Sequence, residues 1–241
     1  MLWPTLAALA ALAVLIGLGN WQMQRLRWKE GLIAKITARV HANPVPLPAR
    51  EPGKTGAADL DYLHVAVKGR FRHDKERYVY DPAPAPVGLG WQVYTPLELA
   101  ESHKIVWVNR GFVPDARKAP QTRAEGQVTG EVDVRGLVRL PATAGLFAAQ
   151  NDVVHNLWYW PDLAAMTASA FPDGSDSAAV LPFTIDADAA STPPGGLPKG
   201  GVTRITLPNR HLEYALTWYG LAATLVGVYL AFVISRLRAV S

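Results

Sequence analysis

The feature that most constrains this chain is an apolar stretch near its C-terminus, from Tyr214 to Ile234, that contains no charged residue. A helix of that length rises about 30 Å, which matches the hydrocarbon core of a bilayer. Aromatic residues stand at its start, as is typical of the membrane–water interface. The stretch therefore predicts a transmembrane helix, which we place with its polar flank at 208–235, and residues 236–241 form a short tail beyond it.

A second apolar run, from Leu2 to Gly19, predicts another transmembrane helix at 1–20. A cleaved signal peptide is the alternative, and it would carry basic residues before the run and a small-x-small site after it. No Lys or Arg precedes this run and Asn20-Trp21-Gln22 follows it, so an uncleaved anchor is favoured. The helix then continues through 21–43 as an amphipathic extension, until Asn43-Pro44 stops it.

Small residues recur at helical spacing in both predicted spans. They are Ala13 and Gly17 in the first span, and Ala223, Gly227 and Ala231 in the second. Because small side chains let transmembrane backbones approach closely, this spacing predicts that the two spans pack together as a pair.

Two spans place both termini on one side of the membrane and residues 44–207 on the other. Basic residues are more numerous after the first span than after the second: Arg25, Arg27, Lys29 and Lys35 against Arg236 and Arg238. A positive-inside count would place 44–207 in the cytoplasm, but the rule weakens for long connections. Composition alone therefore leaves the side undecided.

The pattern of residues 44–207 indicates a mostly antiparallel β domain. Short runs of alternating apolar residues, separated by Gly and Pro, predict strands. They lie at 64–71, 78–80, 90–97, 105–113, 127–138, 180–185 and 202–207. Gly130 and Gly136 fit β-bulges in the fifth run, and 162–171 fits one short helix. The predicted fold class is an α+β membrane protein in which two paired transmembrane helices flank this extramembrane domain.

Several classes of function are excluded by composition. The chain has no cysteine, which excludes disulfides, Cys-ligated zinc, iron–sulfur clusters and thiolate copper transfer. Its net charge is +4, and its basic residues are scattered rather than clustered as in nucleic-acid-binding proteins. The sequence has neither a nucleophile elbow nor a P-loop, and no two histidines have metal-ligand spacing. We therefore predict that the protein is not an enzyme and does not bind nucleic acid.

A polar cluster precedes the C-terminal apolar stretch and contains one histidine, His211, at the expected membrane–water interface. Neutral imidazole is a common metal ligand, but a polar residue that merely caps a transmembrane helix would give the same pattern. On a helix, His211, Ala215 and Trp218 share one face. A small residue beside an aromatic one leaves a slot for a flat ligand, and two ordinary packing residues would also have this spacing.

Four blocks of the sequence resemble those of one known family. The first has the form G-x-W-Q-x-x-R-x-x-W-K and contains Trp21, Gln22, Arg25 and Trp28. The second joins 90–97 to the run V-N-R-G-F-V-P, which contains Asn109, Arg110 and Gly111. The third is W-Y-W-x-D-L at 158–163, and the fourth contains Asn209, His211, Tyr214 and Thr217. In this order, and with apolar runs at both ends, the blocks resemble the surfeit locus (Surf/Shy) family of cytochrome c oxidase assembly factors.

The resemblance implies a chaperone in respiratory chain biogenesis, which matures the haem–copper cytochrome c oxidase. It implies a multi-pass protein of the inner (cytoplasmic) membrane, with 44–207 in the periplasm and both termini in the cytoplasm. A bacterial member fits, because the sequence shows no transit peptide. Haem a is the implied cofactor, bound transiently with His211 as the axial ligand of its iron and with Arg210 and Trp218 beside it.

Two residues depart from the family pattern. Arg210 stands where Asn is usual, and Phe112 replaces the usual Trp. Arg210 can pair with a haem propionate or with Glu213, three residues further along the helix.

The resemblance also implies partners, which are subunit I of the oxidase, haem a synthase and the lipid bilayer. The alternative function is a structural assembly scaffold that holds subunit I and never binds haem. A membrane-anchored enzyme acting on haem or lipid is a third interpretation, which the lack of a nucleophile–base pair disfavours.

Overall fold

The computed structural model describes residues 2–48, 57–82, 88–141, 143–145, 147–174, 176, 179–202 and 208–238. The chain divides into a helical unit, formed by Met1–Thr37 with Ile205–Ser241, and a β unit, Ala38–Arg204. Apart from Val202, the strand predicted at 202–207 lies outside the described residues.

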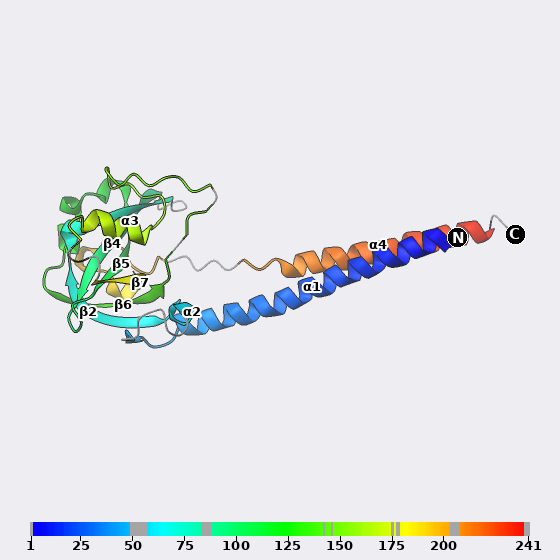
Figure 1. The fold of residues 1–241 in the computed structure, drawn as a ribbon, viewed down its shortest axis with the longest axis horizontal. Coiled ribbons are helices and arrows are strands. Elements are labelled where there is room, and N and C mark those ends of the chain that lie inside the picture. The colour runs from blue at the N-terminus through cyan, green and yellow to red at the C-terminus, as the bar shows by residue number, and fades with distance from the viewer. Residues whose placement is uncertain are drawn as a thin grey trace. The chain divides into compact units, whose positions relative to one another are not determined.

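The helical unit consists of α1 (Leu2–Val40) and α4 (His211–Arg238), which lie side by side (Figure 1). Both helices are rich in Ala and Leu, which favour helix, and both are long and apolar enough to cross a membrane. α1 runs without a break through the predicted span and its predicted extension, and it ends shortly before Asn43-Pro44. The predicted pair of terminal helices is therefore confirmed.

Residues that are shielded from solvent recur at alternating spacings of three and four along both helices. On α1 they include Thr5, Ala8, Leu12, Leu15, Gly19, Gln22 and Leu26. On α4 they include His211, Ala215, Trp218, Ala222, Leu225, Tyr229 and Phe232. This is the repeat of a left-handed coiled coil, in which successive side chains of one helix fit between those of the other.

The residues that line this helix contact are not the ones predicted. Five small residues expected there are exposed: Ala13, Gly17, Ala223, Gly227 and Ala231. A Cβ atom added to Gly17 or Gly227 would meet no heavy atom within 4 Å, whereas one added to Gly19 would lie 2.5 Å from the Tyr219 ring. Alanine and glycine occur on every face of these apolar helices, so their spacing alone does not identify the face that meets the partner helix.

The β unit is built on strands whose order is β1-β2-β6-β7-β5-β4-β3, with an additional pairing between β2 and β4. The strands are β1 (Val45–Pro46), β2 (His64–Phe71), β3 (Arg77–Pro82), β4 (Leu89–Leu99), β5 (Ile105–Pro114), β6 (Glu131–Arg139) and β7 (Val180–Ala187). The β2–β4 pairing closes β2, β6, β7, β5 and β4 into a small barrel. The β1–β2 and β5–β7 pairs are parallel and the other pairs are antiparallel, so the prediction of a mostly antiparallel domain is confirmed.

Inward-facing side chains of the barrel strands form its core. Val65 and Val67 alternate with outward-facing residues along β2 and pack with Leu97, Val108 and other apolar residues of the neighbouring strands. This is the alternation expected of a strand with one buried face. The β unit also contains α2 (Ala57–Leu60) and short 3₁₀ turns at His73–Lys75, Asp115–Arg117, Pro120–Gly126, Ala189–Ser191 and Pro194–Gly196.

Among the described residues of the β unit, α3 (Leu163–Ala170) is the longest helix, and it confirms the helix predicted at 162–171. Asp162 caps its N-terminus by accepting a hydrogen bond from the Ala165 amide. Met166 then packs against Trp107 and Trp158 in a second core cluster, and Figure 1 shows α3 beside the strands.

The bulges predicted at two glycines are absent from the described part of β6. Gly130 precedes the strand with φ of 89°, and Gly136 keeps regular pairing with Val65 on one side and Ala187 on the other. A side chain at Gly136 would collide with the carbonyl oxygen of Asp186. This glycine therefore serves close approach of neighbouring strands rather than a change of register.

Candidate functional site

Two of the sequence blocks meet in the helical unit, where His211 faces Gln22. His211 is the first residue of α4, and its Nδ1 lies 2.7 Å from Oε1 of Gln22 on α1. Gln22 is only 8% exposed, so its amide is held at the contact between the helices. With Oε1 of Gln22 as the acceptor, Nδ1 is the donor, and in the neutral imidazole Nε2 then keeps its lone pair. This is the tautomer in which a histidine can bind a metal through Nε2 while a second residue orients the ring.

The same two blocks meet again where Tyr219 of α4 contacts Gly19 and Asn20 of α1. The Tyr219 hydroxyl donates a hydrogen bond of 2.7 Å to Oδ1 of Asn20, and the Tyr219 ring covers Gly19. Deeper in the pair, Oγ1 of Thr5 lies 2.6 Å from the Tyr229 hydroxyl. Hydrogen bonds between transmembrane helices fix their rotation and register, and here they hold His211 opposite Gln22.

Three polar residues, Asn209, Arg210 and Glu213, lie close to His211 in the sequence. Arg210 pairs with Glu213 through an Nε–Oε2 distance of 3.0 Å, which is the second of the two pairings expected for it. Both side chains are mostly exposed, so the pair contributes little stability and leaves Arg210 able to exchange partners. Within the described residues, Oδ1 of Asn209 is buried without a hydrogen-bond partner. An unsatisfied buried acceptor beside His211 marks a place where a donor from a bound molecule would be stabilising.

The helix face shared by His211, Ala215 and Trp218 is shielded from solvent. Ala215 is completely buried in the contact between the helices, and Trp218 is half-buried beside it. Of the two interpretations of this spacing, ordinary packing is the one the structure supports. Tyr214 is exposed, and the Thr217 hydroxyl donates to the carbonyl oxygen of Glu213. Among the described residues, neither side chain forms a hydrogen bond with His211.

The first block divides between two faces of α1. Gln22 points into the helix contact, whereas Trp21, Arg25 and Trp28 lie on an exposed face. The guanidinium carbon of Arg25 is 6.0 Å from the Trp21 ring centroid and 5.2 Å from that of Trp28. These are cation–π distances, and the three residues form a stack that is separate from the His211 contact.

The block around Arg110 has a structural role in the β unit. Asn109 donates from Nδ2 to Asp186 at 3.2 Å and accepts from the Gly111 amide at 3.1 Å. Gly111 has φ of 109°, and a side chain there would collide with the backbone of Lys199. Asn109 and Gly111 thus tie β5 to β7 and to the loop that follows β7.

Arg110 belongs to a buried charge cluster centred on Glu76. Glu76 Oε1 lies 3.2 Å from Arg110, and Oε2 lies 2.6 Å from Arg123 and accepts at 2.9 Å from the Tyr78 hydroxyl. Burial by itself raises the pKa of Glu76, but hydrogen bonds from His73 and Arg123 and the charges of both arginines lower it to about 2. Burial also lowers the pKa of Arg110, to about 10. The roles of Glu76 and Arg123 were not predictable from the sequence, because an isolated acid or arginine in a β-rich segment carries no motif.

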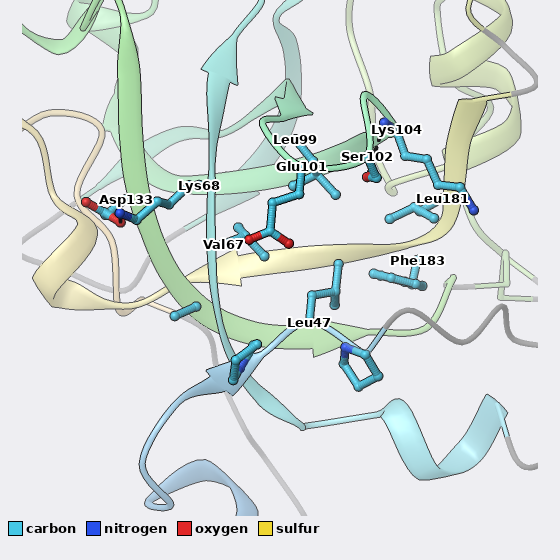
Figure 2. Close-up of a pocket in the computed structure, with 13 residues that line it drawn as sticks. Leu47, Val67, Lys68, Leu99, Glu101, Ser102, Lys104, Asp133, Leu181 and Phe183 are labelled. Carbon is cyan, nitrogen blue, oxygen red and sulfur yellow. Dashed lines mark hydrogen bonds and ion pairs between the residues drawn. The ribbon is translucent and has the colours of Figure 1, made fainter.

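The β unit also contains a pocket that no sequence pattern indicates. Its volume is about 500 Å³, and Leu47, Leu99, Leu181 and Phe183 provide much of its apolar lining (Figure 2). Lys68 and Asp133 lie on its rim, 3.8 Å apart. None of the predicted site residues lines this pocket.

Comparison with known proteins identifies relatives over most of the chain. The model of the SURF1 family matches residues 9–223. Surfeit locus protein 1 of Rattus norvegicus is 43% identical over 224 residues, which cover 88% of this chain and 69% of the relative. The Homo sapiens protein of the same name is 42% identical over 221 residues, covering 86% and 70%. That of Takifugu rubripes is 37% identical over 240 residues, covering 94% and 95%.

Proposed function

The chain belongs to the SURF1 family, and on this premise we propose that it is an assembly factor of the haem–copper cytochrome c oxidase that carries haem a on His211. The resemblance stated from the sequence is thereby confirmed at the level of the family. In this proposal the protein receives haem a, holds its iron through Nε2 of His211, and delivers it to subunit I of the oxidase.

The observation that carries the proposal is the 2.7 Å hydrogen bond between Nδ1 of His211 and Oε1 of Gln22. It supports the tautomer that leaves Nε2 free to bind iron, and haem iron commonly takes imidazole as its axial ligand. The same bond keeps the ring from rotating, so the ligand is oriented before the cargo arrives.

The position of His211 also suits an amphipathic cargo. His211 begins an apolar helix that is long enough to cross a membrane, so the ring lies at the level where headgroups meet the hydrocarbon core. The isoprenoid tail of haem a belongs in lipid, and its propionates belong at the interface, where the exposed Arg210 can exchange Glu213 for a propionate. A single histidine ligand favours an affinity near micromolar, about −8 kcal/mol, from which haem can pass to a tighter site.

We further propose that the protein lies in the bacterial inner membrane with its β unit in the periplasm. The two candidate spans support a membrane location, and the family supports the orientation. His211 then lies at the periplasmic surface of the membrane, with subunit I and haem a synthase as the expected protein partners.

Replacement of His211 by Asn tests the proposal. The side-chain amide nitrogen of the introduced asparagine takes the place of Nδ1 and can still donate to Gln22, so the helix contact is kept while the iron ligand is removed. After purification of the full chain from cells that make haem a, the visible spectrum of wild type is expected to show bound haem. His211→Asn is expected to lose it, and His211→Met to retain part of it, since a thioether is also an axial ligand of haem.

The matched control is His103→Asn, which removes an exposed histidine of the β unit and is expected to leave the haem content unchanged. Full haem content in a folded His211→Asn variant would show that the ligand lies elsewhere.

A scaffold that holds subunit I without haem is the second candidate. It is favoured by the complete burial of Ala215, because packing between the helices accounts for this part of α4 without a ligand. In that case His211→Asn assembles the oxidase as well as wild type does. The family favours a non-catalytic role in both candidates.

A further inference from the structure

We propose that Trp21, Arg25 and Trp28 form a binding site for the phosphate of an anionic phospholipid. The function proposed above does not use this face of α1. Trp21 and Trp28 are 49% and 58% exposed, although the neighbouring Gln22 is buried against α4. The three residues are spaced so that they share one face of a helix, and this face is turned away from the other helix of the pair.

The guanidinium of Arg25 is held in place but has free donors. Its carbon lies 6.0 Å and 5.2 Å from the two indole centroids, so the rings restrict the side chain. Within the described ranges, Arg25 has no ion pair and no hydrogen bond to a side chain or carbonyl. Contact with aromatic faces leaves the N–H groups at the edge of a guanidinium available, and their fork matches two oxygens of one phosphate.

The charge around this stack favours an anion. Glu30 is the one acidic residue in the sequence of α1, whose basic residues are Arg25, Arg27, Lys29, Lys35 and Arg39. Each basic side chain near a membrane surface adds to the attraction of anionic lipid. The surrounding field therefore concentrates anions at a guanidinium that has no carboxylate of its own.

The depth of the stack points to a lipid as the source of the phosphate. From Leu2 to Trp21 the helix rises about 29 Å, so Trp21 lies at the end of the hydrocarbon core and Arg25 about 6 Å beyond it. Lipid phosphates lie at that level, and indole rings favour it. Free phosphate has the same charge chemistry but gains nothing from two exposed indoles, whereas a phospholipid places glycerol and acyl carbons against them.

The test compares two substitutions that change the charge equally. The full chain is purified in mild detergent with added phosphatidylglycerol, and native mass spectrometry measures the lipid retained. Arg25→Gln is expected to lower lipid occupancy about tenfold, the loss of one charge-assisted interaction. Arg27→Gln, an exposed arginine at nearly the same depth on another face, is expected to change it less than about twofold.

Arg25→Lys separates a shaped site from general charge attraction. Lysine keeps the charge but lacks the planar fork, so the site predicts a loss close to that of Arg25→Gln. Equal losses in Arg25→Gln and Arg27→Gln, or full retention in Arg25→Lys, would overturn the proposal. Displacement of the lipid by millimolar inorganic phosphate, or equal retention of phosphatidylcholine, would overturn it as well. The haem content of these variants is expected to stay at the wild-type level, which keeps this test independent of the proposed function.

Discussion

At the scale of single residues, the contact between His211 and Gln22 determines which imidazole nitrogen is available. A ligating histidine whose other nitrogen donates to an acceptor is a stronger electron donor and has a fixed ring orientation. Gln22 lies 2.7 Å from His211 and is almost fully buried, so its side chain has few other positions to occupy. In the proposed haem complex, Gln22 would therefore position the His211 ring without touching the iron.

Gln22→Leu keeps the approximate volume of the side chain and removes the acceptor. The expected result is haem affinity lower by about tenfold to a hundredfold, with a higher reduction potential because the ligand becomes a weaker donor. Redox titration of the purified haem complex measures the potential. The control is Gln24→Leu, since Gln24 is exposed on the same helix. An unchanged potential in Gln22→Leu would mean that this hydrogen bond does not act on the haem ligand.

The cluster around Glu76 is the other place where one residue decides much of the stability. Glu76→Gln would leave Arg110 and Arg123 buried without their shared carboxylate. Removal of one partner from a buried ion pair typically costs about 3–5 kcal/mol. Chemical unfolding, followed by tryptophan fluorescence, is expected to show a loss of that size. The control is Glu98→Gln, whose partner Arg72 is partly exposed and whose loss is expected to cost about 0–1 kcal/mol.

The same cluster predicts a pH dependence. The pKa of Glu76 falls from 4.5 to about 2 on folding, so the ionised carboxylate stabilises the folded state. This contribution is complete above about pH 5 and is lost as the pH falls towards 2. The wild-type free energy of unfolding is therefore expected to decrease across that interval. Glu76→Gln should show a shallower decrease, and an unchanged slope would show that other carboxylates govern acid unfolding.

At the scale of elements, the repeat of three and four residues along α1 and α4 decides how the helices pack. Gly19 faces Tyr219 at a place where a side chain would be 2.5 Å from the ring, whereas Gly17 faces open space. Both glycines lie in the same apolar segment, so they form a matched pair for substitution.

Gly19→Leu is expected to separate the helices, and Gly17→Leu is expected to leave them packed. Because the chain has no cysteine, a Thr5→Cys/Tyr229→Cys pair can report their contact through a short bismaleimide cross-linker, which spans the distance left by the tyrosine side chain. The cross-link should form in this background and in Gly17→Leu, and it should be largely lost in Gly19→Leu. Equal cross-linking in both variants would show that the Gly19–Tyr219 contact does not hold the pair.

The elements differ in how well the sequence predicts them. Strands such as 64–71 and the helix at 162–171 follow from local alternation and capping, and the structure confirms them. The pairing of β2 with β4 joins segments that are distant in sequence, so no local pattern indicates it. The Glu76 cluster and the His211–Gln22 contact also could not be predicted from local sequence, because each joins residues that are distant along the chain. Gly136 was misassigned because a glycine needed for close approach looks like one needed for a bulge.

At the scale of the whole molecule, the chain has two candidate membrane-spanning helices and one β unit. Composition alone does not decide on which side of the membrane the β unit lies. Five basic residues of α1 follow its apolar run, against Arg236 and Arg238 at the end of α4. A charge count alone would therefore retain the β unit in the cytoplasm. The connection between the spans is long, however, and charge determines the orientation of long connections only weakly. The oxidase proposal requires the opposite side.

We predict that the β unit lies in the periplasm. Gly145 is a suitable insertion point, because it is exposed and a Cβ there would meet no heavy atom within 4 Å. A reporter enzyme active only in the periplasm is expected to be active at this position, and the same enzyme fused after Ser241 is expected to be inactive. A reporter active only in the cytoplasm should give the reverse result at both positions. Cytoplasmic activity at Gly145 would place His211 at the cytoplasmic surface, and haem delivery from the periplasmic side would then be excluded.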